Sequence, residues 1–300
     1  MVYIILINYN SWQDTLECLA SLKQLTFLNY KIIIIDNASQ DESVQQISRN
    51  YPDAVIISSQ ENLGFAGGNQ LGIDFALKEG AKYIWLLNND TVVHKESLTE
   101  LVHNAESFPL ALLTNKIYKY GTERDIWYCG GDIHWWKGKP FHIRMHQQDD
   151  QFAKQPYATT WISGCSMFAK AELFQNYHMD KRYFLYFEDV EFCEQLKKGG
   201  ISLFVIPKSI IWHKTSASIG KMSHIQAYYS VRNNMYFVSK QANLIHKVVY
   251  FPYFIVRTLI FSLRYRLRGW KNKDSLKSMV GKAYWRGLID FFCGKYGKLK

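Results

Sequence analysis

The feature that most constrains the fold is a regular alternation of apolar and amphipathic segments in the first third of the chain. Short runs rich in Ile, Val and Leu, each bounded by polar or glycine-containing turns, occupy residues 3–7, 31–35, 54–57 and 83–87. Helix-like segments lie between them, at residues 14–23, 41–50 and 67–79. Strands that alternate with helices are typical of βαβ units. We therefore predict an α/β fold with a mostly parallel sheet, flanked by helices on both faces.

The pattern changes after this Rossmann-like half. A helix is predicted from Glu188 to Lys198, where Gly199 and Gly200 end it. Short strands are predicted at residues 110–118, 126–131, 159–169, 202–206 and 210–212. The remainder is helical in pattern, basic and rich in tyrosine. We predict a catalytic domain over residues 1–220 and a helical C-terminal extension over residues 221–300.

The net charge of +10 is unevenly distributed. Residues 1–220 hold 20 Lys and Arg against 24 Asp and Glu, whereas residues 221–300 hold 16 against 2. A cationic surface attracts phosphates on lipid or on nucleic acid. Because the excess charge is confined to the extension, the distribution favours an enzyme docked on a membrane over a nucleic-acid binder, and no nucleic-acid partner is expected.

Polar side chains follow each of the predicted N-terminal strands. Ligands of open α/β sheets bind at the carboxyl ends of the strands, so these side chains are expected to form a polar site. Asn and Asp also favour turns for their own sake, which is the alternative explanation for any one of them. Neither a G-x-G-x-x-G nor a P-loop motif follows the first strand. The residues concerned are Asn8, Tyr9, Asp36, Asn37, Asn62 and the run from Asn88 to Asp90.

Two carboxylate positions could carry chemistry. Asp90 follows an apolar strand and could hold a hard divalent cation, or it could cap the following turn. Glu188 and Asp189 follow an aromatic run at a predicted helix start, where one of them could be a general base or an N-cap. His213 ends another predicted strand and could be a metal ligand, a phosphate contact or a structural histidine.

Five short motifs occur in an order that resembles a known family. Together they are similar to family 2 inverting glycosyltransferases of the GT-A fold, especially the rhamnosyltransferase-like members that build bacterial cell-surface polysaccharides. The resemblance covers residues 1 to about 220. The motifs are I-N-Y-N at residues 7–10, I-D-N-A-S-Q-D at 35–41, N-L-G-F-A-G-G-N at 62–69, L-N-N-D-T at 87–91 and F-E-D-V-E at 187–191.

This resemblance implies a nucleoside-diphosphate sugar as donor, with deoxythymidine-diphosphate rhamnose first and uridine-diphosphate sugars next. It implies that Asp90 and His213 bind Mg²⁺ or Mn²⁺, with Asn88 in place of the first Asp of the D-x-D motif. Asp189 corresponds to the catalytic base, beside Glu188. Trp161, Ser163 and Gly164 correspond to the acceptor site. The implied donor-binding residues are Asn8, Tyr9, Asp36, Asn37, Asn62, Gly64, Gly67, Gly68, Asn69, Asn89 and Asp90.

Residues 244–268 combine aromatic and aliphatic side chains with five Lys or Arg. This composition is typical of a helix that lies in the headgroup plane of a membrane. The alternative is a helical pair that packs on the catalytic domain or on a second subunit of a homodimer. The five cysteines form no C-x-x-C pair, and residues 1–10 are typical of a first strand rather than of a signal peptide. We expect a cytoplasmic protein, peripheral on the inner face of the cell membrane.

The predicted function is transfer of a sugar to a hydroxyl of a saccharide or lipid-linked saccharide. A nucleotidyltransferase is one alternative, but it would ordinarily carry a glycine-rich loop with a cation after the first strand, and residues 8–12 have no cation. A non-catalytic sugar-nucleotide or membrane-binding scaffold is another. The presence of both Asp90 and Asp189 speaks against a scaffold.

Overall fold

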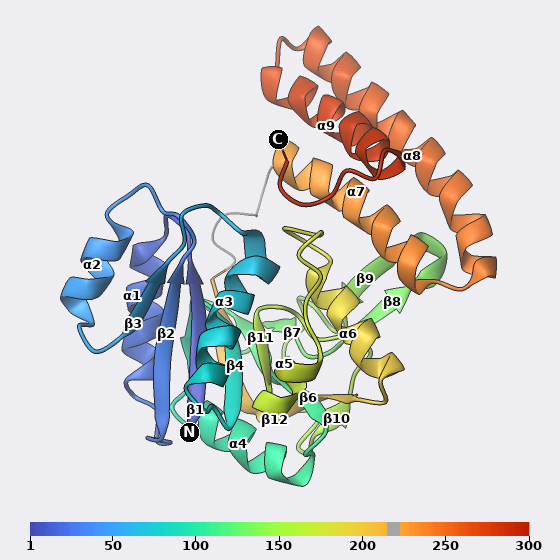
Figure 1. Ribbon diagram of the computed structural model, residues 1–300. Helices are drawn as coiled ribbons and strands as arrows, with labels where there is room; N and C mark the ends of the chain where they lie inside the picture. Colours follow the sequence, from blue (N-terminus) through green and yellow to red (C-terminus); the bar gives the residue numbers. More distant parts are fainter. Residues whose placement is uncertain (215–222, 300) are drawn as a thin grey trace.

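A large mixed sheet with helices on both faces forms the body of the protein (Figure 1). The structure is a computed structural model and describes residues 1–214 and 223–299. Its strands run in the spatial order β10-β12-β6-β11-β4-β1-β2-β3, with β5 paired to β12 and β7 paired to β6. The strands of this sheet are β1 (Val2–Asn8), β2 (Tyr30–Asp36), β3 (Val55–Ser58), β4 (Tyr83–Asn88), β5 (Thr91–Val93), β6 (Ala111–Lys119), β7 (Ile126–Tyr128), β10 (Tyr157–Ala158), β11 (Ser166–Lys170) and β12 (Ser202–His213).

The N-terminal half confirms the predicted α/β fold. β4, β1, β2 and β3 are all parallel, and three helices connect them. Each strand lies within one residue at either end of its predicted range, because strands covered on both faces are continuous apolar runs and are easy to locate. The connecting helices, with the helix after β5, are α1 (Trp12–Leu22), α2 (Ser43–Asn50), α3 (Gly64–Lys78) and α4 (Ser97–Ser107).

Alternate side chains of the strands enter two separate cores. Tyr3 and Ile5 of β1 pack toward Ile73 of α3, in the core that also receives the extension. Ile4 and Leu6 point to the opposite face, in the core that contains residues of α1 and α4. This two-residue periodicity fixes the register of each strand, because a slip of one residue would exchange the two cores. The carboxyl ends of the strands are therefore fixed in position relative to one another.

The second half of the sheet differs from the prediction in two places. The two strands expected at residues 202–206 and 210–212 are one strand, β12, whose register against β6 shifts between Ile206 and Ile210. The strand expected over residues 159–169 is only β11, and the residues before it form a loop with an isolated bridge from Trp161 to Gly131. Between these strands lie a small hairpin and two helices: β8 (Gly131–His134), η1 (Trp135–Lys137), β9 (Lys139–His142), α5 (Ala171–Asn176) and α6 (Glu188–Lys198).

The C-terminal extension is a group of three helices above the carboxyl edge of the sheet (Figure 1). α7 (His224–Gln241) is largely buried and shares the core with the catalytic body through Met235 and Phe237. α8 (Leu244–Lys271) is one helix that contains Pro252. α9 (Ser275–Phe292) packs along α7 and α8. The predicted domain boundary near residue 220 lies outside the described residues.

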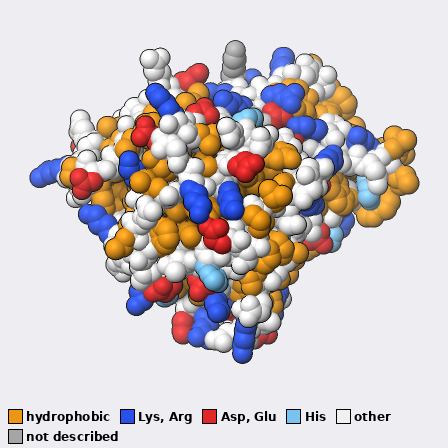
Figure 2. Space-filling view, turned by 60° about the horizontal axis from the view of Figure 1, so that its bottom comes forward, with side chains coloured by type: hydrophobic (Ala, Val, Ile, Leu, Met, Phe, Trp, Pro, Cys, Tyr) orange, Lys and Arg blue, Asp and Glu red, His pale blue; other side chains and the backbone are white. Residues whose placement is uncertain are grey.

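α8 differs from its neighbours in exposure. Large apolar side chains such as Val256, Ile260 and Leu263 lie open to solvent on its outer face. By length and composition α8 could cross a membrane, with 17% of its most apolar window buried, a test that some core helices of soluble proteins also pass. Figure 2 shows apolar side chains gathered on the right-hand flank, the side on which Figure 1 draws α8, with Lys and Arg nearby.

Candidate active site

The carboxyl ends of neighbouring parallel strands meet at one edge of the sheet. Asn8 at the end of β1 is paired with Asp36 of β2, and Ile7 is paired with Asn88 of β4. β2 lies on one side of β1 and β4 lies on the other, so the strand order changes direction at β1. Such a switch in direction opens a crevice at the carboxyl edge, where α/β proteins bind ligands.

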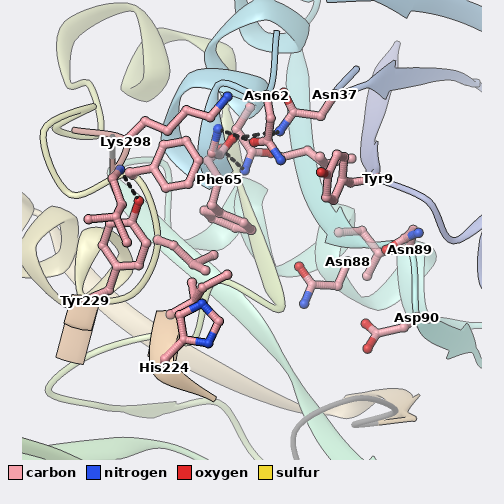
Figure 3. A pocket seen from close by; sticks show the side chains of 18 residues that line it. Tyr9, Asn37, Asn62, Phe65, Asn88, Asn89, Asp90, His224, Tyr229 and Lys298 are labelled. Atoms are coloured by element: carbon pink, nitrogen blue, oxygen red, sulfur yellow. Dashed lines mark hydrogen bonds between the residues drawn. The ribbon is translucent and has the colours of Figure 1, made fainter. Parts of the chain in front are cut away.

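A cavity of about 570 Å³ lies at this edge, a size typical of small-molecule sites. In Figure 3, Tyr9, Asn37 and Asn62 lie along one side of the cavity, and Asn88, Asn89 and Asp90 lie below them. Seven of the residues that the resemblance assigned to the donor line this cavity. They are Tyr9, Asn37, Asn62, Gly64, Asn69, Asn89 and Asp90.

Asn8 and Asp36 are placed behind the cavity wall. Both are buried, and the Asn8 side-chain amide donates to Asp36 at 3.0 Å and to the Ser39 hydroxyl at 3.1 Å. The Thr15 hydroxyl donates to the amide oxygen of Asn8, and Asn89 donates to the Thr15 hydroxyl in turn. Asn8 and Asp36 therefore hold the strand ends together and do not line the cavity.

Asn37 joins the end of β2 to the turn before α3. Its side-chain amide donates to the Asn62 side chain and to the Gly64 carbonyl, and its oxygen accepts from the Leu63 amide. Gly64 has φ +70°, and a Cβ there would lie 2.1 Å from the carbonyl oxygen of Phe184. Only glycine allows this contact, because both the left-handed backbone and the close approach exclude a side chain. The turn at Asn62 is thus locked against the loop that leads to Glu188.

Gly67 and Gly68 lie inside α3, since the helix begins at Gly64 and not at residue 67 as predicted. A Cβ on Gly68 would lie 3.1 Å from Ile7, and one on Gly67 would lie 2.8 Å from Leu63. The absence of side chains lets the helix approach β1 closely. These two glycines are not among the residues that line the cavity.

Asp90 and His213 meet although 123 residues of sequence separate them. β5 pairs with the end of β12, so that His213 is opposite Thr91, and the Lys214 amide donates to the Asp90 carbonyl. Nε2 of His213 lies 3.1 Å from Oδ1 of Asp90, and the Trp127 ring packs edge-on against the imidazole. Asp90 Oδ1 and His213 Nδ1 are nevertheless buried without a hydrogen-bond partner. In the part of the chain that the structure describes, the Asp90 side chain accepts no hydrogen bond from the following turn.

These two side chains fit a divalent cation as a partial coordination shell. A carboxylate oxygen suits Mg²⁺ or Mn²⁺, and an imidazole nitrogen suits Mn²⁺. Within residues 1–214 and 223–299, no group of three or more His, Cys, Asp or Glu could hold a metal ion. A cation here would complete its shell with water and with oxygens of a bound ligand.

Asp189 lies at the start of α6, against the loop before β11. Its Oδ2 accepts from the Gly164 amide at 3.0 Å, and its Oδ1 accepts from the Val190 amide at 2.8 Å. A Cβ on Gly164 would lie 2.9 Å from the Phe65 ring and 3.4 Å from Cβ of Asp189. Phe65 lines the cavity, whereas Gly164 and Asp189 are not among its lining residues.

Burial changes the acidity of both carboxyl groups. It raises the pKa of Asp189, which the amides of Gly164 and Val190 partly oppose. It also raises the pKa of Glu188, to which the charge of Asp189 adds. Oε2 of Glu188 is buried with no hydrogen-bond partner. Phe187, and not either acid, is the N-cap residue of α6, so the capping alternative does not account for the pair.

The three residues assigned to the acceptor lie next to Asp189 in one loop. Gly164 contacts Asp189 directly, whereas Trp161 is 4% exposed and donates from its indole to the Asp132 carbonyl. Ser163 is also buried, and its hydroxyl accepts from the Cys165 amide. The Cys165 carbonyl in turn accepts from the Asn88 amide at 2.9 Å. This loop therefore links Asp189 to the strand end that carries Asp90.

Several residues of the cavity were not predicted. Phe65 lies in the N-L-G-F-A-G-G-N motif, and Phe184 and Leu185 lie in the run before the acidic pair, which was the available signal. The extension supplies five more residues, and nothing in its local sequence indicates a site. Those residues are His224, Ile225, Tyr229, Lys298 and Leu299.

The fold is of the GT-A type. Residues 3–175 match the family Glycosyl transferase family 2. This match covers more than half of the chain, and the protein belongs to that family. The predicted alternatives, a nucleotidyltransferase and a scaffold, are not favoured by this membership. The protein is a sugar-transferring enzyme.

The chain is similar in sequence to curated glycosyltransferases and similar in fold to solved structures. The chain is 24% identical to the N-acetylglucosaminyl-diphospho-decaprenol L-rhamnosyltransferase of Mycobacterium tuberculosis, over 75% of this chain and 80% of that protein. It superposes on S. aureus TarS in complex with UDP-GlcNAc with TM-score 0.57 and 15% identity, over 97% of this chain and 80% of that one. For GalNAc-T7 with UDP, GalNAc and Mn²⁺ the TM-score is 0.63 at 15% identity, over 77% of this chain and 47% of that one.

Proposed function

We propose that the protein transfers a sugar, with inversion, from a nucleoside-diphosphate sugar to a hydroxyl of a saccharide or lipid-linked saccharide. One observation carries the proposal. The backbone of Gly164 and Cys165 is hydrogen-bonded to Asp189 on one side and to Asn88 on the other. This loop would hold the candidate base near the strand end that carries Asp90, which lines the cavity.

The donor would lie along the strand ends. The Tyr9 ring is 47% exposed at the cavity and offers an aromatic surface to a base. Asn37 and Asn62 offer polar groups beside it, held by the turn before α3. Asn8, Asp36, Gly67 and Gly68 support this site from behind. The diphosphate would extend toward Asp90.

Asp189 would act as the general base. Its two oxygens accept from fixed backbone amides, which orient the carboxylate without consuming all of its lone pairs. Burial raises its pKa, so it is a stronger base than an exposed aspartate. It would take the proton of the acceptor hydroxyl while that oxygen attacks the anomeric carbon opposite the leaving group. A single displacement of this kind inverts the anomeric configuration.

Asp90 and His213 would hold Mg²⁺ or Mn²⁺. When bound, the cation neutralises the charge that develops on the leaving nucleoside diphosphate. The orphaned Oδ1 of Asp90 and its separation of 3.1 Å from His213 support this role. The Trp127 ring and the β5–β12 pairing keep the two side chains in place. Trp161, Ser163 and Gly164 would form the floor of the acceptor site.

Rhamnose is the proposed sugar and a lipid-linked saccharide the proposed acceptor, in cell-surface polysaccharide synthesis. The mycobacterial relative supports this, because its name specifies rhamnosyl transfer to a diphospho-decaprenol. α8 supports it independently. A groove of about 600 Å³ on α8 combines apolar side chains such as Val256 and Ile260 with Arg257 and Arg264. Apolar surface beside cations suits the boundary between acyl chains and anionic headgroups.

We therefore propose that residues 221–300 form an extension that docks the enzyme on the inner face of the cell membrane, from the cytoplasm. The exposed apolar face of α8 carries this proposal. A second copy of the chain could cover the same face in a homodimer. Gel filtration with and without detergent distinguishes the two, because a dimer formed through α8 would dissociate in detergent.

A donor panel tests the proposed function. Release of nucleoside diphosphate is measured from deoxythymidine-, uridine- and guanosine-diphosphate sugars with Mg²⁺, Mn²⁺ or EDTA, together with equilibrium binding of each donor. We expect turnover of one donor that requires the metal and is lost in Asp90→Ala. The product's anomeric configuration, read by NMR, tests inversion. Binding of no donor by the wild type would overturn the proposal.

A further inference from the structure

The cavity lining offers little positive charge to the donor's diphosphate. A diphosphate carries two or more negative charges, and proteins bind such groups with Lys, Arg, metal ions or clustered amides. The strand ends contribute the Asp90 carboxylate and several neutral amides. Among the described residues that line the cavity, Lys298 is the one Lys or Arg. It comes from the far side, opposite the sheet (Figure 3).

The segment that carries Lys298 is fixed on both sides of it. The Gly297 amide donates to the Arg182 carbonyl at 2.8 Å, and the Leu299 amide donates to the Tyr229 hydroxyl at 2.7 Å. Figure 3 shows the second of these bonds at the cavity wall. The Tyr229 ring is stacked on Phe184, at 5.4 Å between ring centroids. The backbone at Lys298 is therefore held against two residues of the cavity.

Arg232 of α7 reinforces this attachment from inside. Its side chain is fully buried and donates to the Gly297 carbonyl at 2.7 Å and to the Tyr183 carbonyl at 2.9 Å. One guanidinium thus joins the Lys298 segment to the loop before Glu188. Its charge is satisfied by carbonyls and by the rings of Tyr228 and Tyr229. Burial of an Arg costs free energy unless all of its donors are paired. Pairing of the Arg232 donors therefore requires the Lys298 segment and the loop before Glu188 to keep this arrangement.

Lys298 itself takes no part in that junction. Its side chain is exposed, and the described part of the chain offers it no ion-pair partner. Lys295, three residues earlier, differs because its Nζ lies 3.9 Å from Asp290 and it does not line the cavity. A structural ion pair among the described residues therefore does not explain the position of Lys298, and its side chain is open to a ligand in the cavity.

We propose that the segment Gly297–Leu299 is the second wall of the donor site and that Lys298 binds the diphosphate of the nucleotide sugar. The inference rests on the proposed function, because it takes the cavity to be the donor site. It adds a phosphate contact from the extension, opposite the metal position at Asp90. The leaving diphosphate would then meet positive charge from both walls.

Binding of deoxythymidine diphosphate, uridine diphosphate, thymidine and uridine tests this contact. Calorimetric titrations are made in EDTA, so that no metal ion shares the charge. We expect Lys298→Gln to weaken diphosphate binding about tenfold, equivalent to about 1.4 kcal/mol, and to change nucleoside binding less than about twofold. Lys298→Arg should retain most of the affinity. Lys295→Gln is the matched control and should bind as the wild type does.

The outcomes separate the two proposals. A wild type that binds a diphosphate while Lys298→Gln binds it equally well overturns the Lys298 contact and leaves the donor site standing. Equal losses for diphosphate and nucleoside also overturn it, because the lysine would then contact the base or ribose. If the wild type binds a diphosphate only with Mn²⁺, the same variants are compared with Mn²⁺ present. A wild type that binds no diphosphate either in EDTA or with Mn²⁺ overturns the proposed function, and the Lys298 contact with it. Selective loss of the diphosphate supports both.

Discussion

The sheet body and the helical extension both contain buried Asn side chains, but these act over different ranges. Asn8 in the sheet bonds to neighbouring strand ends that the sheet topology already brings together. Asn233 in α7 donates to the carbonyls of Tyr183, Leu185 and Tyr186, in a loop that no sheet pairing holds. Strand pairing thus positions the residues that the sheet contributes to the site. The extension completes the site by holding a loop that lies outside the sheet.

That loop has an unusual backbone. Phe184, Tyr186 and Phe187 all have positive φ, between 64° and 75°, immediately before the acidic pair. Residues other than glycine adopt this conformation at a cost of about 1 kcal/mol or more each, and surrounding contacts must maintain it. Asn233 and Arg232 supply those contacts. α7 therefore supports the loop of residues 183–187, which we call the catalytic loop for its proposed role, whereas α8 presents an apolar face to solvent.

The largest effect is expected in the body, at Asp189. Asp189→Asn removes the proposed base while keeping an oxygen that can accept from the Gly164 amide. We expect kcat to fall by about 10² to 10⁴. Initial rates of nucleoside diphosphate release with acceptor present measure this. Glu188→Gln is the control, since its buried carboxyl has a raised pKa and the amide resembles the protonated acid. Equal losses in both variants would contradict the role of Asp189.

The pH profile tests the same carboxylate. Asp189 acts as a base only when ionised, and burial raises its pKa above that of an ordinary aspartate. Activity should therefore fall on acidification at a higher pH than an unperturbed aspartate would give. The pH dependence of kcat/KM in the free enzyme reports this group. A profile that stays flat down to the ordinary range of aspartate would contradict the assignment.

The next largest effect is expected at Asp90. Asp90→Asn keeps the size of the side chain but removes the charge that would hold the cation beside His213. We expect kcat to fall by about 100-fold at saturating donor, because charge on the leaving group is less well neutralised. Titration of activity with Mn²⁺ should also show weaker metal affinity. Activity of the wild type that is unaffected by EDTA would contradict the metal role.

The sheet body could be predicted from the sequence more completely than the helical extension. β1 to β4 were located closely because each is an uninterrupted apolar run, and the polar residues after them converge because the strands are parallel and adjacent. Asp90 and His213 were each identified, yet only the β5–β12 pairing shows that they meet. Asn8 and Gly68 were predicted to bind the donor, but they support the cavity from behind and do not line it. Their burial depends on packing between elements, which no local sequence pattern specifies.

The contribution of the extension could not be predicted in the same way. Lys298 and Tyr229 lie 69 positions apart, and long-range contacts such as the hydrogen bond from the Leu299 amide to Tyr229 place them at one cavity. Asn233 and Asn234 are adjacent in sequence and indistinguishable there. In the structure the first bonds the catalytic loop, and the second donates to Gly138 and accepts from Tyr250. Helical periodicity gives the face of each residue but not the partner.

This adjacent pair provides the sharpest test of α7. Asn233→Ala leaves carbonyls of the catalytic loop unpaired, so we expect kcat to fall about tenfold with little change in donor KM. Asn234→Ala is a matched control, because it also removes a buried amide that has partners. Both variants should lose about 1–3 kcal/mol of unfolding free energy. Equal kcat in the two variants would show that the loop does not depend on α7.

The smallest effect on chemistry is expected at α8. Val256, Ile260 and Leu263 are exposed on one helical face, at 56%, 46% and 58%. Replacing all three with Gln keeps the helix and removes the apolar surface. We expect turnover with a short soluble acceptor to be unchanged, and partition onto phosphatidylglycerol vesicles to fall at least about tenfold. Sedimentation with the vesicles measures the partition.

Point variants suit α8 better than removal of the extension. Tyr250 and Phe254 of α8 and Leu288 of α9 lie in the core shared with the catalytic body, so a deletion would expose that core and confuse folding with docking. Leu110→Gln is the matched control, because Leu110 is 66% exposed in the body, away from α8. If both sets of variants partition alike, α8 has no special affinity for lipid. If the α8 variant loses turnover as well, the outer face of α8 contributes to catalysis. The proposal that α7 and α8 have separate roles would then be wrong.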